Sequence, residues 1–225
     1  MRFFDRKKIR LLFGFTIFLV LLILNCVMYC NKAGTKRDLV VVIDVGHGGN
    51  DPGKIGVDNV KEKDVNLQIA LCLKAQLQAR GVKVILTREG DVCLATNGAT
   101  NKKVSDMHNR VSLINASGAD YMISIHQNSY PEAEISGPQV FYYGSSEMSK
   151  KLAEAIQAQL IVDLQPPKER EIKTGNDLYI LKNSQCPGVI VECGFLSNPT
   201  ECENLQNPQY QQAVAAAIAR AICKL

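Results

Sequence analysis

The chain has 225 residues, of which 46% are hydrophobic and 21% charged, a composition typical of a folded protein with a substantial core. Its formal net charge is +4, and five basic side chains against one acidic side chain in the first ten residues account for all of it. Residues 31–225 are therefore neutral overall, so we expect no nucleic-acid partner.

The N-terminal segment predicts a membrane anchor. Residues 11–30, LLFGFTIFLVLLILNCVMYC, contain no charged side chain. A helix of that length spans about 30 Å, the thickness of a hydrocarbon core, and its basic flank predicts that residues 31–225 lie outside the cytoplasm. No A-x-A cleavage site follows, and Asn25 is too large for a lipoprotein cleavage site before Cys26. If cleavage did occur, the domain would be secreted.

The domain organisation follows from this division. We predict a basic flank and anchor in residues 1–30, a polar linker in residues 31–38 and one domain in residues 39–225. The domain has no C-x-x-C pair, which argues against thiolate zinc and thioredoxin-like chemistry, and we expect most of its cysteines to be core residues.

Apolar runs rich in Val and Ile alternate with helical patterns along the domain. Strands are predicted at residues 38–45, 82–87, 120–126, 138–143, 177–181 and 187–192. Helices are predicted at residues 64–81, 104–116, 146–162 and 207–225, the first of them capped by Asp64. We therefore predict a single α/β domain with a mostly parallel six-stranded sheet, flanked by helices on both faces and preceded by an N-terminal transmembrane helix.

Four polar residues lie at or near the predicted carboxyl ends of strands, where ligands gather in such sheets. His47 follows the first strand, Glu62 lies in the loop before the first helix, His126 ends the third strand and Glu192 ends the sixth. Taken singly, each has an ordinary explanation: a histidine in a turn, or a solvated acid. Glu192 is harder to dismiss because it closes the apolar run PGVIV, where a carboxylate needs a partner or a function.

Taken together, two imidazoles and one carboxylate are a donor set that suits zinc with a fourth position open for water. Zinc lowers the pKa of bound water to about 7, and a carboxylate that is not a ligand can carry the water proton to a leaving amine. The sequence thus favours metal-assisted amide hydrolysis. A phosphate site at the glycine turn GHGGNDPG is disfavoured, because the turn lacks G-x-G-x-x-G and a Walker Lys-Ser/Thr pair.

Four stretches carry a resemblance to a known family: IDVGHGGNDPG, KEKDVNLQIAL, SIHQNS and VIVECGFLSNP. In this order they resemble the zinc-dependent N-acetylmuramoyl-L-alanine amidases of bacterial cell-wall metabolism, over nearly all of the exported domain. The resemblance implies that His47, Glu62 and His126 bind Zn²⁺ and that Glu192 is the catalytic acid and base. It implies a peptidoglycan substrate, cut between N-acetylmuramic acid and L-alanine of the stem peptide. Val45 stands where the family often has proline, which changes the rigidity of the turn and not the ligand.

Within the family, the chain is similar to the membrane-anchored sporulation amidases of endospore-formers, which act on spore cortex in muramic-δ-lactam formation. Some relatives carry an inserted helix that blocks the zinc. Only 11 residues, 127–137, separate His126 from the fourth predicted strand, so no such helix fits. Control is expected from elsewhere, through weakly held zinc or an accessory activator protein.

Several alternatives stay open on the sequence alone. A zinc peptidase or deacetylase of the cell wall would use the same metal chemistry, and a non-catalytic zinc- and peptidoglycan-binding module would keep the same residues. Cys193 could be the nucleophile of a cysteine hydrolase, although strand alternation points it away from the face of Glu192. His108 could replace Glu62 as the third zinc ligand. Arg88, Arg110 and Asn128 could contact substrate or be structural.

Overall fold

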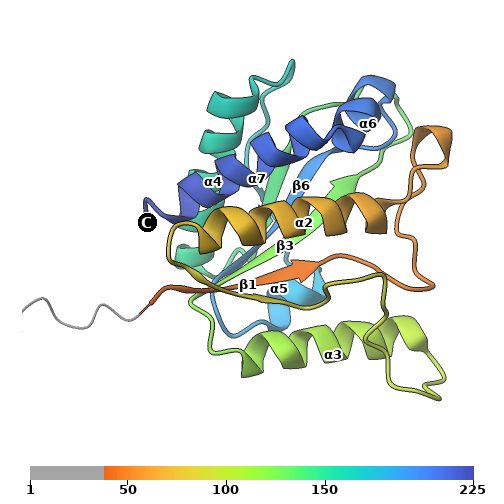
Figure 1. Cartoon of the computed structure of the whole chain (residues 1–225), viewed down its shortest axis with the longest axis vertical. Helices are drawn as coiled ribbons and strands as arrows, with labels where there is room; N and C mark the ends of the chain where they lie inside the picture. The colour runs from red at the N-terminus through yellow and green to blue at the C-terminus, as the bar shows by residue number, and fades with distance from the viewer. Residues whose placement is uncertain (1–37) are drawn as a thin grey trace, which may run out of the picture. The chain divides into compact units, whose positions relative to one another are not determined.

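The computed structural model describes residues 38–225, which form one compact unit (Figure 1). The predicted anchor and nearly all of the predicted linker lie outside these residues. Within residues 38–225, no helix has the length and apolar character needed to cross a membrane.

A six-stranded sheet forms the centre of the domain, in the strand order β2-β1-β3-β6-β4-β5. The strands are β1 (Val40–Val45), β2 (Lys83–Leu86), β3 (Tyr121–Asn128), β4 (Gln139–Tyr142), β5 (Lys173–Thr174) and β6 (Gly188–Phe195). Neighbouring strands run parallel except at one place, where β4 pairs antiparallel with β6. The sheet is therefore mixed and mostly parallel, which confirms the predicted class in its general form.

Helices cover both faces of the sheet (Figure 1). The helices are α2 (Glu62–Gln78), α3 (Lys102–Ala116), α4 (Glu147–Leu164), α5 (Tyr179–Asn183), α6 (Pro199–Gln206) and α7 (Pro208–Ile222), with a 3-10 turn η1 (Val57–Asn59). On one face, α2, α4 and α7 pack against alternate residues of the strands in a large apolar core. On the other face, α3 and α5 cover a smaller cluster that includes Val42, Met122 and Ile190.

One predicted strand is wrong. In residues 177–181, the short helix α5 begins at Tyr179 with Leu178 as its N-cap, and the strand that completes the sheet is the two-residue β5 before it. The sequence of four apolar residues there fits either structure, because short apolar runs do not separate strand from buried helix. In the fold, the consecutive residues Ile180 and Leu181 are buried while Leu178 and Tyr179 are exposed, which breaks the alternation of a strand.

Two helix starts also differ from prediction. Helix α6 was missed, although Asn198 accepts a hydrogen bond from the Glu201 amide and Pro199 occupies the first turn, a recognisable start signal. Helix α2 begins at Glu62 rather than at a cap on Asp64, and no side chain caps it. The amides of Glu62 and Lys63 donate instead to the backbone carbonyls of Lys54 and Pro52. Glu62 is therefore the first helical residue, held against the glycine turn.

Candidate metal centre

The sheet brings the predicted site residues to one edge. Val45, the last residue of β1, is the register partner of Ile125, and His126 is the register partner of Glu192. His47 follows β1 directly, so the motifs of β1, β3 and β6 meet at the carboxyl ends of three adjacent strands. This is the edge at which open α/β sheets bind their ligands.

The turn after β1 directs His47 toward this edge. His47 itself has φ of 60°, in the left-handed region that non-glycine residues rarely adopt, and Gly48 and Gly49 also have positive φ. Two buried arginines hold the turn: Arg88 donates to the carbonyls of Val45 and Gly46, and Arg110 donates to those of Val45 and His47. The strained conformation is thus fixed by charge-assisted hydrogen bonds.

A buried anion balances Arg110. Asp44 is 1% exposed; it pairs with Arg110 at 3.0 Å and accepts hydrogen bonds from Ser124 and Thr87. Burial opposes ionisation of Asp44, but the Arg110 charge and the Ser124 hydrogen bond lower its pKa below the ordinary value. Both arginines that the sequence left open are therefore structural residues of the turn.

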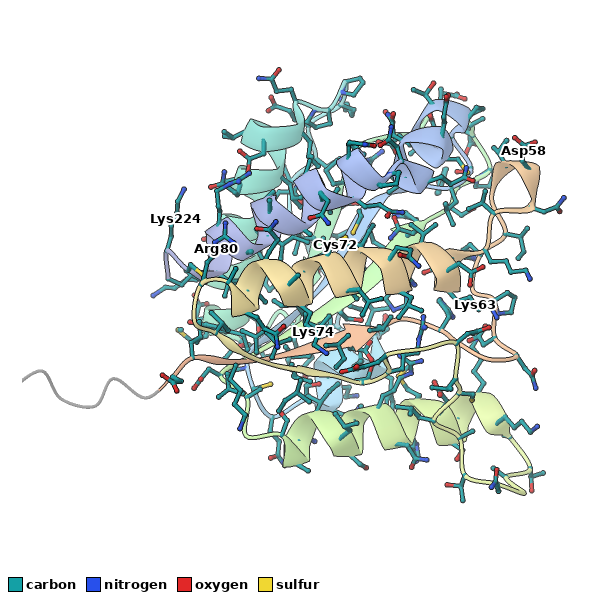
Figure 2. All side chains as sticks on the ribbon, viewed as in Figure 1. Asp58, Lys63, Cys72, Lys74, Arg80 and Lys224 are labelled. Atoms are coloured by element: carbon teal, nitrogen blue, oxygen red, sulfur yellow. The ribbon has the colours of Figure 1, made fainter. Side chains whose placement is uncertain are left out.

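Lys63 ties the same turn to the following loop. Its ammonium donates to the carbonyl of Gly49 at 2.8 Å and to Asp91 at 2.6 Å. Asp91 also accepts a hydrogen bond from the Gly49 amide. Figure 2 shows Lys63 at the N-terminal end of α2, so the residue after Glu62 anchors the loop that carries His47.

Three of the predicted residues form one cluster. Glu62 Oε2 lies 3.1 Å from His47 Nε2, and Glu62 Oε1 lies 2.8 Å from His126 Nδ1. One ligand atom from each residue lies within 4.8 Å of the others. Two imidazole nitrogens and a carboxylate oxygen at zinc bond lengths of about 2.0–2.2 Å would stand roughly 3–3.5 Å apart, so the group fits a tetrahedral zinc site with a free position.

Surrounding groups fix the ligand orientations. His47 Nδ1 lies 2.9 Å from Asp51 Oδ2, which sets the other ring nitrogen toward Glu62. The Glu62 carboxylate accepts hydrogen bonds from the Lys54 and Gln127 amides and from the Asn66 side chain. Sequence reasoning missed Asp51, although its place four residues after His47 in the same turn was the available signal.

Two glycines leave the room that these side chains need. A Cβ at Gly46 would lie 2.5 Å from His126 Nε2, and one at Gly53 would lie 2.5 Å from Glu62 Oε2. Gly53 also has φ of 69°. Neither position accepts a side chain without displacing a proposed ligand.

Electrostatics in the cluster favour a cation. Burial opposes ionisation of Glu62, but hydrogen bonds and charge from His126 and His47 lower its pKa well below the ordinary range. Burial works against the charged form of His126, but Glu62 outweighs it and raises the pKa of that imidazole to about 8. A metal ion would replace protons at the histidines, so metal binding and proton release are coupled.

Glu192 lies beside the cluster without joining it. Its Oε2 atom is buried and has no hydrogen-bond partner among residues 38–225. Burial raises the pKa of Glu192 to about 7, and the charge of His126 acts in the opposite direction. A carboxylate that is buried, unpaired and near neutrality is suited to taking up and releasing a proton.

The two alternative residues lie elsewhere. Cys193 is fully buried in the large core on the opposite face of the sheet, and burial raises the pKa of its thiol well above the ordinary value. A buried, protonated thiol is a poor nucleophile. His108 is exposed on α3, where its ring stacks on Tyr179 with 5.3 Å between the centroids. It is not part of the cluster.

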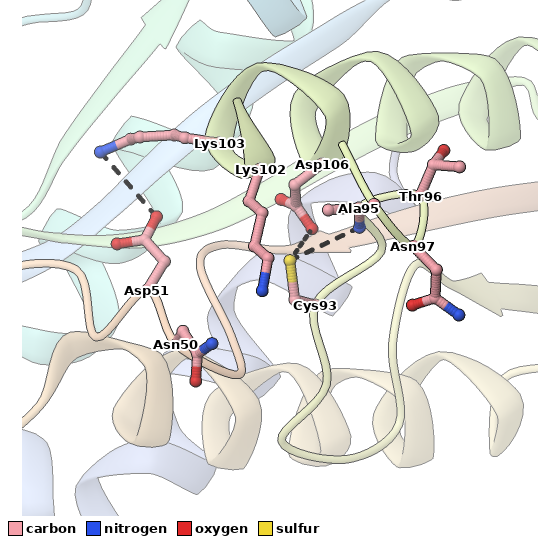
Figure 3. Close-up of a pocket in the computed structure, with 10 residues that line it drawn as sticks. Asn50, Asp51, Cys93, Ala95, Thr96, Asn97, Lys102, Lys103 and Asp106 are labelled. Carbon is pink, nitrogen blue, oxygen red and sulfur yellow. Dashed lines mark hydrogen bonds and ion pairs between the residues drawn. The ribbon is translucent and has the colours of Figure 1, made fainter. Parts of the chain in front are cut away.

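Two cavities flank the site. One, of about 410 Å³, lies between the glycine turn and the start of α3, and its lining includes Asp51, Asp106, Lys102 and Lys103. Figure 3 shows both lysines extending from the start of α3 toward the turn, with Lys103 directed at Asp51. The second cavity, of about 430 Å³, lies over β4 and β5 and is lined in part by Asn128.

The chain is similar to known proteins over most of its length. The N-acetylmuramoyl-L-alanine amidase family profile matches residues 41–224. The germination-specific N-acetylmuramoyl-L-alanine amidase of Bacillus subtilis (strain 168) is 38% identical over 228 residues, covering 97% of this chain and 95% of that protein.

Solved structures show the same similarity. The CwlD amidase from Clostridioides difficile, solved in complex with the GerS lipoprotein, has a TM-score of 0.80 and 38% identity, covering 83% of this chain and 98% of that chain. The N-acetylmuramoyl-L-alanine amidase from Clostridium difficile 630 has a TM-score of 0.76 and 30% identity, covering 84% and 97%.

Proposed function

This chain belongs to the N-acetylmuramoyl-L-alanine amidase family, and from that premise we propose that His47, Glu62 and His126 hold its zinc ion while Glu192 carries the protons of the reaction. The protein hydrolyses the amide between N-acetylmuramic acid and L-alanine of the peptidoglycan stem peptide, outside the cytoplasm, with zinc as its cofactor. The observation that carries the assignment of roles is the unpartnered Glu192 Oε2 beside a compact cluster of three ligand atoms.

The roles follow from the chemistry of amide hydrolysis. Zinc, when bound, acts as a Lewis acid toward oxygen. Asp51 orients His47, and the absence of a side chain at Gly46 leaves room for the His126 ring. The Lys54 and Gln127 amides hold Glu62. The Glu192 carboxylate takes a proton from the attacking water and then delivers it to the nitrogen of the leaving amine.

The test compares the purified full chain with Glu192→Gln. Both proteins should bind about one zinc ion, and only the wild type should release stem peptides from peptidoglycan, with a new L-alanine amine as the end group. A chelator should abolish release, and added zinc should restore it. If Glu192→Gln also loses its zinc, Glu192 is a ligand and the division of roles is wrong. A new glucosamine amine among the products would instead identify a deacetylase.

We also propose that the biological setting is the spore cortex, where stem-peptide removal leads to muramic-δ-lactam. The support is the similarity to a protein named as a germination-specific amidase and the predicted anchor at residues 11–30. Deleting the gene in its own organism should leave vegetative growth intact and remove muramic-δ-lactam from the spore cortex. Normal lactam content in the deletion strain would reject this setting.

An accessory lipoprotein is the proposed partner. A similar amidase was solved in complex with a lipoprotein, and residues 129–138 of this chain contain no helix that could cover the metal cluster. Activity that rises on adding the cognate lipoprotein, with zinc already saturating, would support regulation through such a partner. Full activity of the isolated chain would reject the requirement.

A further inference from the structure

We propose that the cavity over β4 and β5 binds the anionic stem peptide of the substrate, with Arg170 and Lys173 pairing with its carboxylates. The inference rests on the amidase reaction and adds a peptide-binding subsite to it. The cavity has a volume of about 430 Å³, and its lining combines these two cations with the polar residue Gln139 and the rings of Tyr130 and Phe141.

The cavity adjoins Glu192 on the side away from His47. Gln139 is the register partner of Glu192 in the antiparallel pair of β4 and β6, and directly opposed residues share a face of the sheet at about 5 Å. The strand order places β1 and β3 on one side of β6 and places β4 and β5 on the other. The path from the metal cluster through Glu192 therefore leads into this cavity.

The position of the leaving amine decides which part of the substrate enters the cavity over β4 and β5. In hydrolysis, the water oxygen bonds to the carbonyl carbon, the C–N bond breaks, and the proton taken up by Glu192 goes to the amine nitrogen. That nitrogen must lie within hydrogen-bond reach of Glu192. The nitrogen belongs to L-alanine, so the rest of the stem peptide extends beyond Glu192, toward β4 and β5.

The charges of the cavity suit such an occupant. The free carboxylates of a stem peptide lie beyond its L-alanine. Neither Arg170 nor Lys173 forms an ion pair with a carboxylate in residues 38–225, and no acidic residue lines the cavity. The charge of Arg170 acts on the buried Glu201, but neither cation is engaged in an ion pair, so each can pair with an incoming carboxylate without first breaking one.

Arg170 is also held in place. Its guanidinium lies 4.8 Å from the centroid of the Phe195 ring, and its Nε donates to the Ser136 carbonyl at 2.7 Å. These contacts fix the position of the side chain and leave its terminal nitrogens free for a planar, two-point contact with a carboxylate. A residue ordered before binding loses less entropy when the ligand arrives.

The cavity beside α3 is a poorer candidate for the anionic peptide. Its lining contains Asp51 and Asp106 as well as Lys102 and Lys103, so carboxylates already occupy it. Asp51 faces His47, and Asp106 pairs with Arg110 at 2.6 Å. This difference supplies a matched control, because a lysine of similar exposure can be neutralised in either cavity.

The experiment measures kcat and KM of the full chain on soluble glycan-peptide fragments whose peptide carboxylates are either free or amidated. Lys173→Gln and Arg170→Gln should each lower kcat/KM on the free substrate about tenfold or more, mainly through KM. On the amidated substrate the same variants should match the wild type. Lys102→Gln should stay within about twofold on both substrates, and zinc content should not change in any variant.

Further variants and outcomes separate the explanations. Arg170→Lys keeps the charge and should recover part of the loss, which a purely structural role on Phe195 would not predict. Lys173 is exposed, so its variant tests the proposal even if Arg170→Gln destabilises the fold.

Equal losses on free and amidated substrates, or losses that follow glycan length, would overturn the peptide subsite while leaving the amidase assignment intact. A zinc-loaded wild type that cuts neither substrate, even with the cognate lipoprotein added, would instead overturn the amidase assignment itself.

Discussion

The two sides of the sheet edge that carries the site differ in how firmly their side chains are held. On the metal side, around the glycine turn, buried arginines, Asp44 and Lys63 hold the backbone carbonyls, and the ligands are oriented by further hydrogen bonds. On the other side, the proton-transfer side, lies Glu192, which we propose carries the protons of the reaction. Its Oε2 has no partner among the described residues, and the cations of the neighbouring cavity form no ion pair there. The contrast separates a region that must not move from one that must meet water and substrate.

Removing Arg110 should break the metal side. Arg110→Met leaves Asp44 buried without its cation and removes the donor to the His47 carbonyl, so we expect a loss of about 3–5 kcal/mol in the free energy of unfolding. Chemical denaturation measures it. Arg220→Met breaks the partly exposed pair with Asp163 and should cost about 1 kcal/mol or less. Equal costs for the two variants would contradict the structural role of Arg110.

The environment of Glu192 should make the stability of the folded chain depend on pH. Burial raises the pKa of Glu192 in the folded chain to about 7, above its ordinary value near 4.5. The pKa of Glu192 is higher in the folded chain than in the unfolded chain. Its contribution to stability is therefore complete below the unfolded pKa and is lost as pH rises through the folded pKa.

In metal-free protein, wild type should therefore lose on the order of 2 kcal/mol relative to Glu192→Gln between pH 4.5 and 7. Denaturation of both proteins across this range measures the difference, and subtracting the two curves removes the contribution of the histidines. A difference that does not vary with pH would show that Glu192 is solvated.

Asp51 tests how far the metal side depends on its outer contacts. Asp51→Ala removes the partner of His47 Nδ1, so zinc affinity should fall about 10- to 100-fold while the fold persists. Competition with a coloured chelator measures the affinity. Asp64→Ala, a change of an exposed acid in the first turn of α2, should leave the affinity unaltered. Unchanged affinity in Asp51→Ala would mean that the turn alone orients His47.

The same contrast explains what sequence reasoning could predict. The meeting of His47, His126 and Glu192 at one edge could be predicted, because each follows or ends an apolar strand and strand ends of a parallel sheet meet at one edge. The place of Glu62 as first residue of α2 could not be found, because carbonyls of a distant turn start that helix in place of a side-chain cap.

Other features depend on tertiary contacts and could not be predicted from the sequence. The antiparallel direction of β4 leaves no mark in the sequence, and β5 has only two residues, too few for a pattern. The structural role of Arg88 depends on carbonyls brought near it by folding. Local patterns thus predicted which residues meet at this edge but not the contacts that support them.

The smallest expected effect concerns the third histidine. His108 lies on α3, exposed and stacked on Tyr179 of α5, so His108→Ala should leave zinc content and peptide release within about twofold of wild type. The lost ring contact should cost about 0.5–1.5 kcal/mol of stability. Metal analysis and an unfolding curve test both statements, with Tyr179→Ala as the matched removal of the other ring. Zinc loss in His108→Ala would show that His108 on α3 contributes to the metal site.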